Sequence, residues 1–326
     1  MTSRDKVLNA VTFQGMPYIP LMTGPDADTA RIGFNAANSF NPEKDGENEW
    51  GCVWSSLNPE QGDQGQVIFH PLSDWDNSRN YRFPDPFAAG RFDEAARRIE
   101  ELRENDLFII GNLGKGPMHL LDDLRGFENY LTDLLVAPEN IDFMLDGIFN
   151  FLNGILLQYA SLGVDAIWLT DDQAIQSGPL FSMDIWQEKL KPHYSKLFRT
   201  AHENDCLVFM HTCGNISEHL VPLADAGVDL LDNKQPNLWI DSQSVNEVRG
   251  KISFSTCIDI QSVMQRIETT EIEAEVSRLI RRLSLPSGGF IGTRYGSLDL
   301  HLSEEKVQLM LQAFKNFSWE NSCVCV

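Results

Sequence analysis

From residue 92 onward the chain alternates short apolar segments with longer amphipathic ones, and this rhythm constrains the fold more than any other feature. Short segments that are almost entirely apolar are typical of strands buried on both faces, and therefore of a parallel sheet. The amphipathic segments between them predict helices. Including one earlier segment, strands are expected at residues 18–22, 107–112, 164–170, 207–211, 228–232, 252–256 and 288–293.

This succession predicts an α/β protein built as a (β/α)8 barrel, because seven or eight strands in 326 residues suit that fold in number and length. A doubly wound sheet is the alternative, but no glycine-rich phosphate loop follows the first strand. Helices are expected at residues 4–13, 92–104, 118–124, 127–135, 138–162, 183–204, 216–226, 240–248, 260–283 and 303–317.

Residues 36–90 interrupt the rhythm, since Asn, Pro, Gly and Trp are frequent there and no helical period holds. Residues 49–54 and 65–70 suggest a hairpin-like excursion. A long insertion in a compact domain is usually a lid, a binding loop or an oligomer contact. We therefore expect one barrel domain over residues 1–326 with an irregular insertion at about 36–90. The oligomeric state stays open, a homodimer included.

Charge and cysteine content narrow the partners and the compartment. The chain has 26 basic and 47 acidic residues and a net charge of −21, which argues against nucleic acid or a membrane surface as partner. Six scattered cysteines lack the density of a disulfide scaffold, and the N-terminus has no apolar signal core, so a reducing cytoplasm is expected. The most apolar long stretch, 141–169, is interrupted by polar residues and predicts a buried helix plus strand.

Polar side chains follow nearly every predicted strand. In a barrel the carboxyl ends of all strands meet at one face, where active sites lie. These residues are Asp26 after the first strand, Asn112 at the second, Asp171, Asp172 and Gln173 after the third, His211 and Cys213 at the fourth, Asn233, Lys234 and Gln235 after the fifth, Cys257 and Asp259 after the sixth, and Arg294 and Tyr295 after the seventh. Their expected convergence makes this edge the candidate site.

His211 and Cys213 are the strongest metal-ligand candidates. Residues two apart in a strand point to the same face, so both side chains face one centre if the strand continues through them. Histidine and cysteine are typical zinc ligands, and Cys257 with Asp172 would complete the set. A metal-bound thiol loses its proton, which would give a reactive thiolate.

The adjacent pair Asp171 and Asp172 offers acid–base chemistry as the alternative. Neighbouring residues of a strand point to opposite faces, so only one of the two carboxylates is expected to face the centre. The other is expected to bond the backbone or an arginine.

Several segments together resemble the uroporphyrinogen decarboxylase superfamily over nearly the whole chain. They are residues 171–178 (DDQAIQSG), 211–215 (HTCGN), 226–229 (AGVD) and 288–291 (GGFI). The His-x-Cys-Gly segment resembles the corrinoid-dependent branch, which includes methylcobalamin:coenzyme M methyltransferases. This resemblance implies a (β/α)8 barrel, a zinc ion at the strand ends, and methyl transfer between a corrinoid protein and a small acceptor or donor.

Roles follow from this hypothesis. No corrinoid-binding segment of the form Asp-x-His-x-x-Gly is visible, so cobalamin would come on a separate corrinoid protein. The expected zinc ligands are His211, Cys213 and Cys257, the expected catalytic residues are Asp171, Asp172 and Gln173, and the expected substrate-binding residues are Asp26, Asn112, Arg294 and Tyr295.

The chain departs from the family pattern in two places. Residues 294–301 hold no cysteine, where the zinc methyltransferases have a ligand, so Cys257 or His301 would substitute. Residues 23–28 are acidic, where the decarboxylases have arginines, and this disfavours a polycarboxylate substrate. Two rival functions remain: a metal-independent lyase that acts on a small carboxylate through Asp171 or Asp172 and Arg294, and a non-catalytic barrel that binds a corrinoid or a methyltransferase partner.

Overall fold

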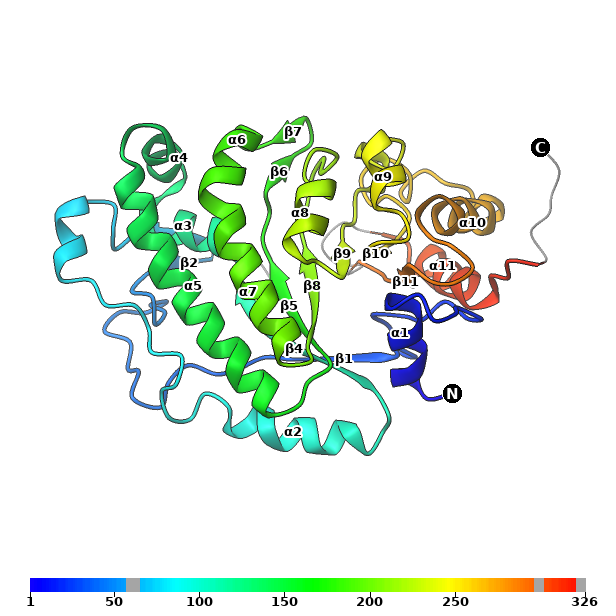
Figure 1. The fold of residues 1–326 in the computed structure, drawn as a ribbon, viewed down its shortest axis with the longest axis horizontal. Coiled ribbons are helices and arrows are strands. Elements are labelled where there is room, and N and C mark those ends of the chain that lie inside the picture. The colour runs from blue at the N-terminus through cyan, green and yellow to red at the C-terminus, as the bar shows by residue number, and fades with distance from the viewer. Residues whose placement is uncertain (57–64, 296–301, 321–326) are drawn as a thin grey trace.

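A parallel seven-stranded sheet forms the centre of the computed structural model, which describes residues 1–56, 65–295 and 302–320. The strand order is β1-β4-β5-β8-β9-β10-β11, so each strand pairs with the next one along the barrel and all pairs are parallel. The bounds are β1 Thr29–Ile32, β4 Phe108–Lys115, β5 Ala166–Thr170, β8 Leu207–His211, β9 Leu230–Asp232, β10 Ser253–Thr256 and β11 Phe290–Gly292. The sheet curls and helices cover its outer face, which confirms the predicted α/β barrel (Figure 1).

The segment around Leu21 closes the ring between the last strand and the first. Leu21 forms an isolated parallel bridge with Gly292, and the Met22 N–H donates to the Gly292 carbonyl at 2.8 Å. On its other side, the Asp28 N–H donates to the Leu21 carbonyl at 2.8 Å. The prediction of a full strand over 18–22 is therefore wrong in extent, because Pro20 has no N–H to donate to a ladder. The neighbouring strand β1 was not predicted.

The helices follow the predicted order along the chain. Figure 1 shows α5, α7 and α8 side by side on the outer wall, and α1 next to α11 near the two termini. Among the described residues, no helix is long and apolar enough to cross a membrane. The bounds are α1 Ser3–Val11, α2 Asp93–Arg103, α3 Pro117–Arg125, α4 Phe127–Val136, α5 Pro138–Ser161, α6 Met183–Ile185, α7 Lys191–Glu203, α8 Leu220–Ala226, α9 Gln243–Val248, α10 Ile272–Leu283 and α11 Glu304–Asn316.

Two predicted helices have irregular beginnings. A π-turn, η3 (Trp186–Leu190), separates α6 from α7. The helix expected at 260–283 is regular only from α10 onward, after a short 3-10 turn, η5 (Thr269–Glu271). Two further 3-10 segments in the described part of the chain are η2 Trp75–Arg79 and η4 Pro236–Leu238.

The described part of the 36–90 region has little regular structure. It contains the predicted hairpin, with β2 (Val53–Ser55) antiparallel to β3 (Gln66–Phe69). A partly buried ion pair holds it to the loop before α2, where Arg91 donates to both carboxylate oxygens of Glu49, at 2.7 and 2.9 Å. Trp50 also packs edge-on against Phe151 of α5, with ring centroids 4.9 Å apart.

Residues inside the barrel follow the strand period of two, and this period positions the site. Phe108, Trp168 and Phe209 belong to one interior cluster, in which the rings of Phe108 and Phe209 stack at 5.6 Å. Continuing two residues along β8 from Phe209 leads to His211, and two residues along β9 from Leu230 leads to Asp232. Both polar side chains therefore extend from the apolar interior at the carboxyl ends of their strands.

The two remaining short strands, β6 (Ala174–Ile175) and β7 (Gly178–Pro179), form a small antiparallel pair directly after β5.

Candidate metal centre and cavity

Three potential metal-binding side chains converge at the carboxyl ends of β5 and β8. The ligand atoms of Asp172, His211 and Cys213 all lie within 4.8 Å of one another. The Cys213 Sγ lies 3.4 Å from the His211 Nε2, which in turn lies 3.9 Å from the Asp172 Oδ1. The structure thus brings together His211 and Cys213 as the two-residue spacing predicted, with Asp172 as the third member.

A sharp turn after Cys213 keeps the cysteine at this edge. Gly214 has a φ of +81°, and a Cβ on it would lie 2.4 Å from the carbonyl oxygen of Ala174. Only glycine fits that conformation and that approach. The Cys213 N–H donates to the Asp172 Oδ1 at 2.8 Å, which joins the loops after β5 and β8.

The second nitrogen of His211 bonds a buried carboxylate. Its Nδ1 lies 2.6 Å from the Oδ1 of Asp232, whose other oxygen accepts from the Lys234 ammonium. Burial opposes ionisation of Asp232, but the Lys234 charge and the His211 hydrogen bond hold its pKa well below the usual range. An ionised Asp232 makes Nδ1 the donor and leaves Nε2 free as a ligand, the usual arrangement of a metal-binding histidine.

The surroundings of Cys213 favour the protonated form of its thiol. Burial, followed by the negative charge of Asp172, raises its pKa to about 12. A cation at this position would reverse that effect and release the proton.

His119, in the first turn of α3, is a neighbour of the site that the sequence did not indicate. Its Nε2 lies 3.6 Å from the Asp172 Oδ2, and its Nδ1 lies 3.1 Å from the Thr170 carbonyl. Burial would lower the pKa of His119, but the nearby carboxylates of Asp172 and Asp171 raise it to about 9. Burial likewise opposes ionisation of Asp172, yet His119 and His211 lower its pKa. The available signal in the sequence was its position in the first turn of the helix predicted at 118–124.

Asp171 and Gln173 lie behind the centre rather than in it. Both are fully buried. Asp171 accepts hydrogen bonds from the Met118 N–H and the Tyr194 hydroxyl, and burial raises its pKa. The prediction that one of the two aspartates faces the centre is thus met by Asp172, while Asp171 faces the protein interior.

A cavity of about 650 Å³ opens beside His211 within the ring of strands. Within the described part of the chain, its charged lining consists of Arg31, Lys234 and Arg294 and one carboxylate, that of Asp232. Asp232 pairs with His211 and Lys234, and Arg294 lies 3.9 Å from Glu304 of α11. Among the described residues Arg31 forms no ion pair, and its guanidinium lies 4.8 Å from the ring centre of Trp168. The described lining of the cavity is therefore cationic, although the chain as a whole is strongly acidic.

The predicted substrate-binding residues divide into two groups. Arg294 and Tyr295 line the cavity. Asp26 instead pairs with Lys315 of α11 beside a separate, smaller hollow. The Asn112 Oδ1 accepts from the Gly114 N–H at 3.1 Å, and Asn112 does not line the cavity.

Cys257 does not join the three-residue cluster. It is almost fully buried, and burial raises its pKa to about 12. Of the two residues expected to complete the set, Asp172 and Cys257, the structure brings only Asp172 to His211 and Cys213. The other expected substitute, His301, lies outside the described residues.

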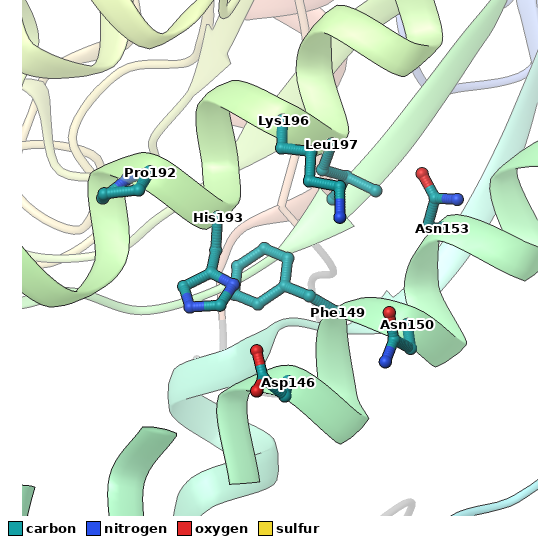
Figure 2. Close-up of a pocket in the computed structure, with 8 residues that line it drawn as sticks. All are labelled: Asp146, Phe149, Asn150, Asn153, Pro192, His193, Lys196 and Leu197. Atoms are coloured by element: carbon teal, nitrogen blue, oxygen red, sulfur yellow. The ribbon is translucent and has the colours of Figure 1, made fainter. Parts of the chain in front are cut away.

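A second hollow, of about 250 Å³, lies on the outer wall between α5 and α7 (Figure 2). The imidazole of His193 stacks on the ring of Phe149, with centroids 4.9 Å apart, and Asp146 and Lys196 lie beside it. It is remote from the strand ends and contains no cluster of metal-binding side chains among the described residues. The candidate site is therefore the inner cavity.

Fold and site together define a parallel α/β barrel that gathers three potential metal ligands at its strand ends. The model of the uroporphyrinogen decarboxylase (URO-D) family matches residues 55–317, and the chain belongs to this family. The structure is also similar to a methyltransferase from Methanosarcina mazei, with a TM-score of 0.68 and 16% identity over 96% of this chain and 98% of that one.

Two curated relatives from Methanosarcina mazei are methyltransferases. The chain is 26% identical over 178 residues to the methylcobamide:CoM methyltransferase MtbA, covering 53% of this chain and 50% of the relative. It is 24% identical over 187 residues to a methylated-thiol–coenzyme M methyltransferase, covering 56% of this chain and 50% of the relative. The matches thus span about half the length of these relatives, and they support an enzyme of methyltransferase type.

Proposed function

We propose that the protein is a methyltransferase that moves a methyl group between a corrinoid carried by a separate protein and a small acceptor or donor, with zinc bound by Asp172, His211 and Cys213. The observation that carries the proposal is the convergence of these three side chains beside the cationic cavity. Three protein ligands with room for a fourth are typical of catalytic rather than structural zinc.

The donor geometry fits zinc. Usual Zn–S and Zn–N distances at tetrahedral angles place the two ligand atoms about 3.5 Å apart, and the Cys213 Sγ and His211 Nε2 are separated by 3.4 Å. When bound, zinc would keep a coordinated thiol in its nucleophilic thiolate form near neutral pH.

The chain's own residues position the ligands and the substrate. Asp232 holds the Nδ1 proton of His211, and this fixes the tautomer with Nε2 free. Arg31 and Arg294 on the cavity wall favour a small acceptor or donor that carries negative charge. A reducing compartment such as the cytoplasm would keep Cys213 a free thiol.

The test is metal analysis of purified wild-type protein against His211→Ala and Cys213→Ala. Wild type should contain about one zinc per chain, and both variants should lose most of it. Wild-type protein should also demethylate methylcobalamin when a small thiol is added. Substoichiometric zinc in wild type under non-chelating conditions would contradict the proposal of a zinc-dependent enzyme.

The cationic cavity also suits a metal-independent lyase that acts on a small carboxylate. Turnover of a carboxylate after complete removal of metal, without any methyl donor, would favour this second function. Tight binding of a corrinoid protein without methyl exchange would instead indicate a non-catalytic barrel.

A further inference from the structure

Four buried side chains behind the metal centre form a network that the proposed chemistry does not use. We call Asp171, Gln173, Trp186 and Tyr194 the Asp171 network. The Gln173 Nε2 donates to the Asp171 Oδ2 at 3.2 Å and to the Tyr194 hydroxyl oxygen at 2.7 Å. The Trp186 Nε1 donates to the Gln173 Oε1 at 2.8 Å.

Asp171 has no capacity left for a substrate. Its Oδ1 accepts from the backbone N–H groups of Met118 and His119, at 2.8 and 3.4 Å. Its Oδ2 accepts from Gln173 and from the Tyr194 hydroxyl. A carboxylate offers about four acceptor positions, so all of them are occupied. Because the residue is also 0% exposed, it cannot touch a ligand in the cavity.

The π-turn η3 explains how two helical residues reach the same partner. Trp186 and Tyr194 are eight residues apart, which in a regular α-helix separates their directions by about 80° around the axis. A wider π-turn begins at Trp186 and absorbs this offset. The two rings stack with centroids 6.1 Å apart, and both side chains reach Gln173. Such turns within α-helices are frequent at functional sites.

The network fixes both chain neighbours of Asp172. Asp171 is anchored as described, and the Gln173 N–H donates to the Thr212 Oγ1 at 3.2 Å. Between these two anchors the Asp172 carboxylate projects toward the site and accepts from the Cys213 N–H. Gly116 allows the backbone to approach Asp171 closely, because a Cβ at residue 116 would lie 2.3 Å from the Cβ of Asp171.

We propose that the Asp171 network is a positioning device that sets Asp172 as a metal ligand, and that Asp171, Tyr194 and Trp186 are positioning rather than catalytic residues. The inference rests on the metal site of the proposed function. It assigns to the π-turn a role in ligand geometry across two separate chain segments, 171–173 and 186–194.

The first test measures metal affinity in the full-length protein. Cobalt(II) is titrated into wild type, Tyr194→Phe and Asp171→Asn, with the thiolate-to-cobalt absorption band as signal and a competing chelator to set the scale. Outer partners of metal ligands typically contribute about 10–100-fold to affinity, so both variants should bind at least about tenfold more weakly, with a changed band. The change Tyr194→Phe keeps the ring and its packing, so the variant retains the apolar contacts of the fold.

Tyr159→Phe is the matched control. Tyr159 is also fully buried, and its hydroxyl donates to the backbone carbonyl of Ile32 at 2.8 Å, away from Asp172. Tyr159→Phe should lose about as much stability as Tyr194→Phe, but it should bind cobalt with wild-type affinity. If Tyr194→Phe loses stability but binds cobalt within about twofold of wild type, the network is purely structural and the inference falls.

The second test needs no metal. Crystal structures of metal-free wild type and Tyr194→Phe should show the 2.8 Å contact between the Cys213 nitrogen and the Asp172 Oδ1 kept in the first and lost in the second. If wild type binds no metal but Asp172 moves in the variant, the proposed function falls and the positioning role stands. An Asp172 that stays in place in the variant overturns the positioning role.

Discussion

The Nδ1 of His211 lies 2.6 Å from the Oδ1 of Asp232, at the ends of two neighbouring parallel strands. His211 and Asp232 are register partners across β8 and β9, so this contact follows from the sheet pairing itself. The same strand β9 is flanked at its other end by a similar pair, in which the His202 Nε2 lies 2.8 Å from the Asp229 Oδ2. The His211–Asp232 pair lies in the candidate site, whereas the His202–Asp229 pair lies at the other end of β9. Variants of the second pair therefore serve as controls for variants of the first.

Replacing Asp232 with Asn should weaken zinc binding by about 10–100-fold without abolishing it, because the amide orients His211 less well than the carboxylate. His211→Ala should weaken binding more, since a ligand is lost. Chelator competition measures both affinities. Asp229→Asn, at the opposite end of β9, should leave zinc affinity unchanged; an equal loss in Asp229→Asn would show that general destabilisation explains the effect.

Arg31→Met should weaken use of an anionic substrate selectively. A hydrogen bond to a charged group contributes about 1.5–3 kcal/mol, so the KM for 3-mercaptopropionate as methyl acceptor should rise at least about tenfold. The KM for uncharged 3-mercaptopropanol should change less than about twofold. The control is Lys315→Met, a cation outside the cavity that pairs with Asp26. An equal rise in KM for both thiols would show that Arg31 does not bind the negative charge of the substrate.

The stability contributed by His202 should depend on pH. The hydrogen bond to Asp229 raises the pKa of His202 above 6.5, so the protonated form is favoured by folding. The contribution is therefore complete below pH 6.5 and is lost as the pH rises through the folded-state pKa. Both groups are partly exposed, so we expect less than about 1 kcal/mol. Urea unfolding of wild type and His202→Gln should show a difference at pH 5.5 that disappears at alkaline pH; a pH-independent difference would contradict this account.

Gly116→Ala should destabilise the protein by about 1–3 kcal/mol, because the new Cβ would lie 2.3 Å from the Cβ of fully buried Asp171. Gly33→Ala is the matched control, since a Cβ there meets nothing within 4 Å and its φ lies outside the left-handed region. Denaturant unfolding measures both. A stable Gly116→Ala protein would mean that Asp171 yields easily, and would argue against a rigid network behind the site.

The succession of strands and helices could be predicted because the spacing of apolar residues that marks each type depends only on nearby residues in the chain. Helices such as α5 and α11, and strands such as β5 and β8, lie where the pattern indicates. Strand β1 (Thr29–Ile32) was missed because it mixes polar and apolar residues, with exposed Arg31 lining the cavity and Ile32 buried. Its strand character comes from pairing with β4, which no local pattern encodes.

The site was predictable in part. The spacing of His211 and Cys213 placed them together, and only one of Asp171 and Asp172 faces the centre. The spacing could not show which one, because that depends on whether Tyr194 and the first turn of α3 occupy the inner position. Asp232, His119 and Arg31 join the site through contacts across strands and helices far apart in the chain.

The sequence alone determined the strand–helix order, the barrel class and a His-x-Cys pair at a strand end, since each depends on neighbours within a few residues. Tertiary structure alone decided that Asp172 rather than Cys257 accompanies that pair, and that the cavity of an acidic protein is cationic. The physical reason is that side-chain direction at a strand end is set by what fills the space behind it. Here that space holds Gly116, Tyr194 and Gln173, which leave Asp171 buried and Asp172 facing the site.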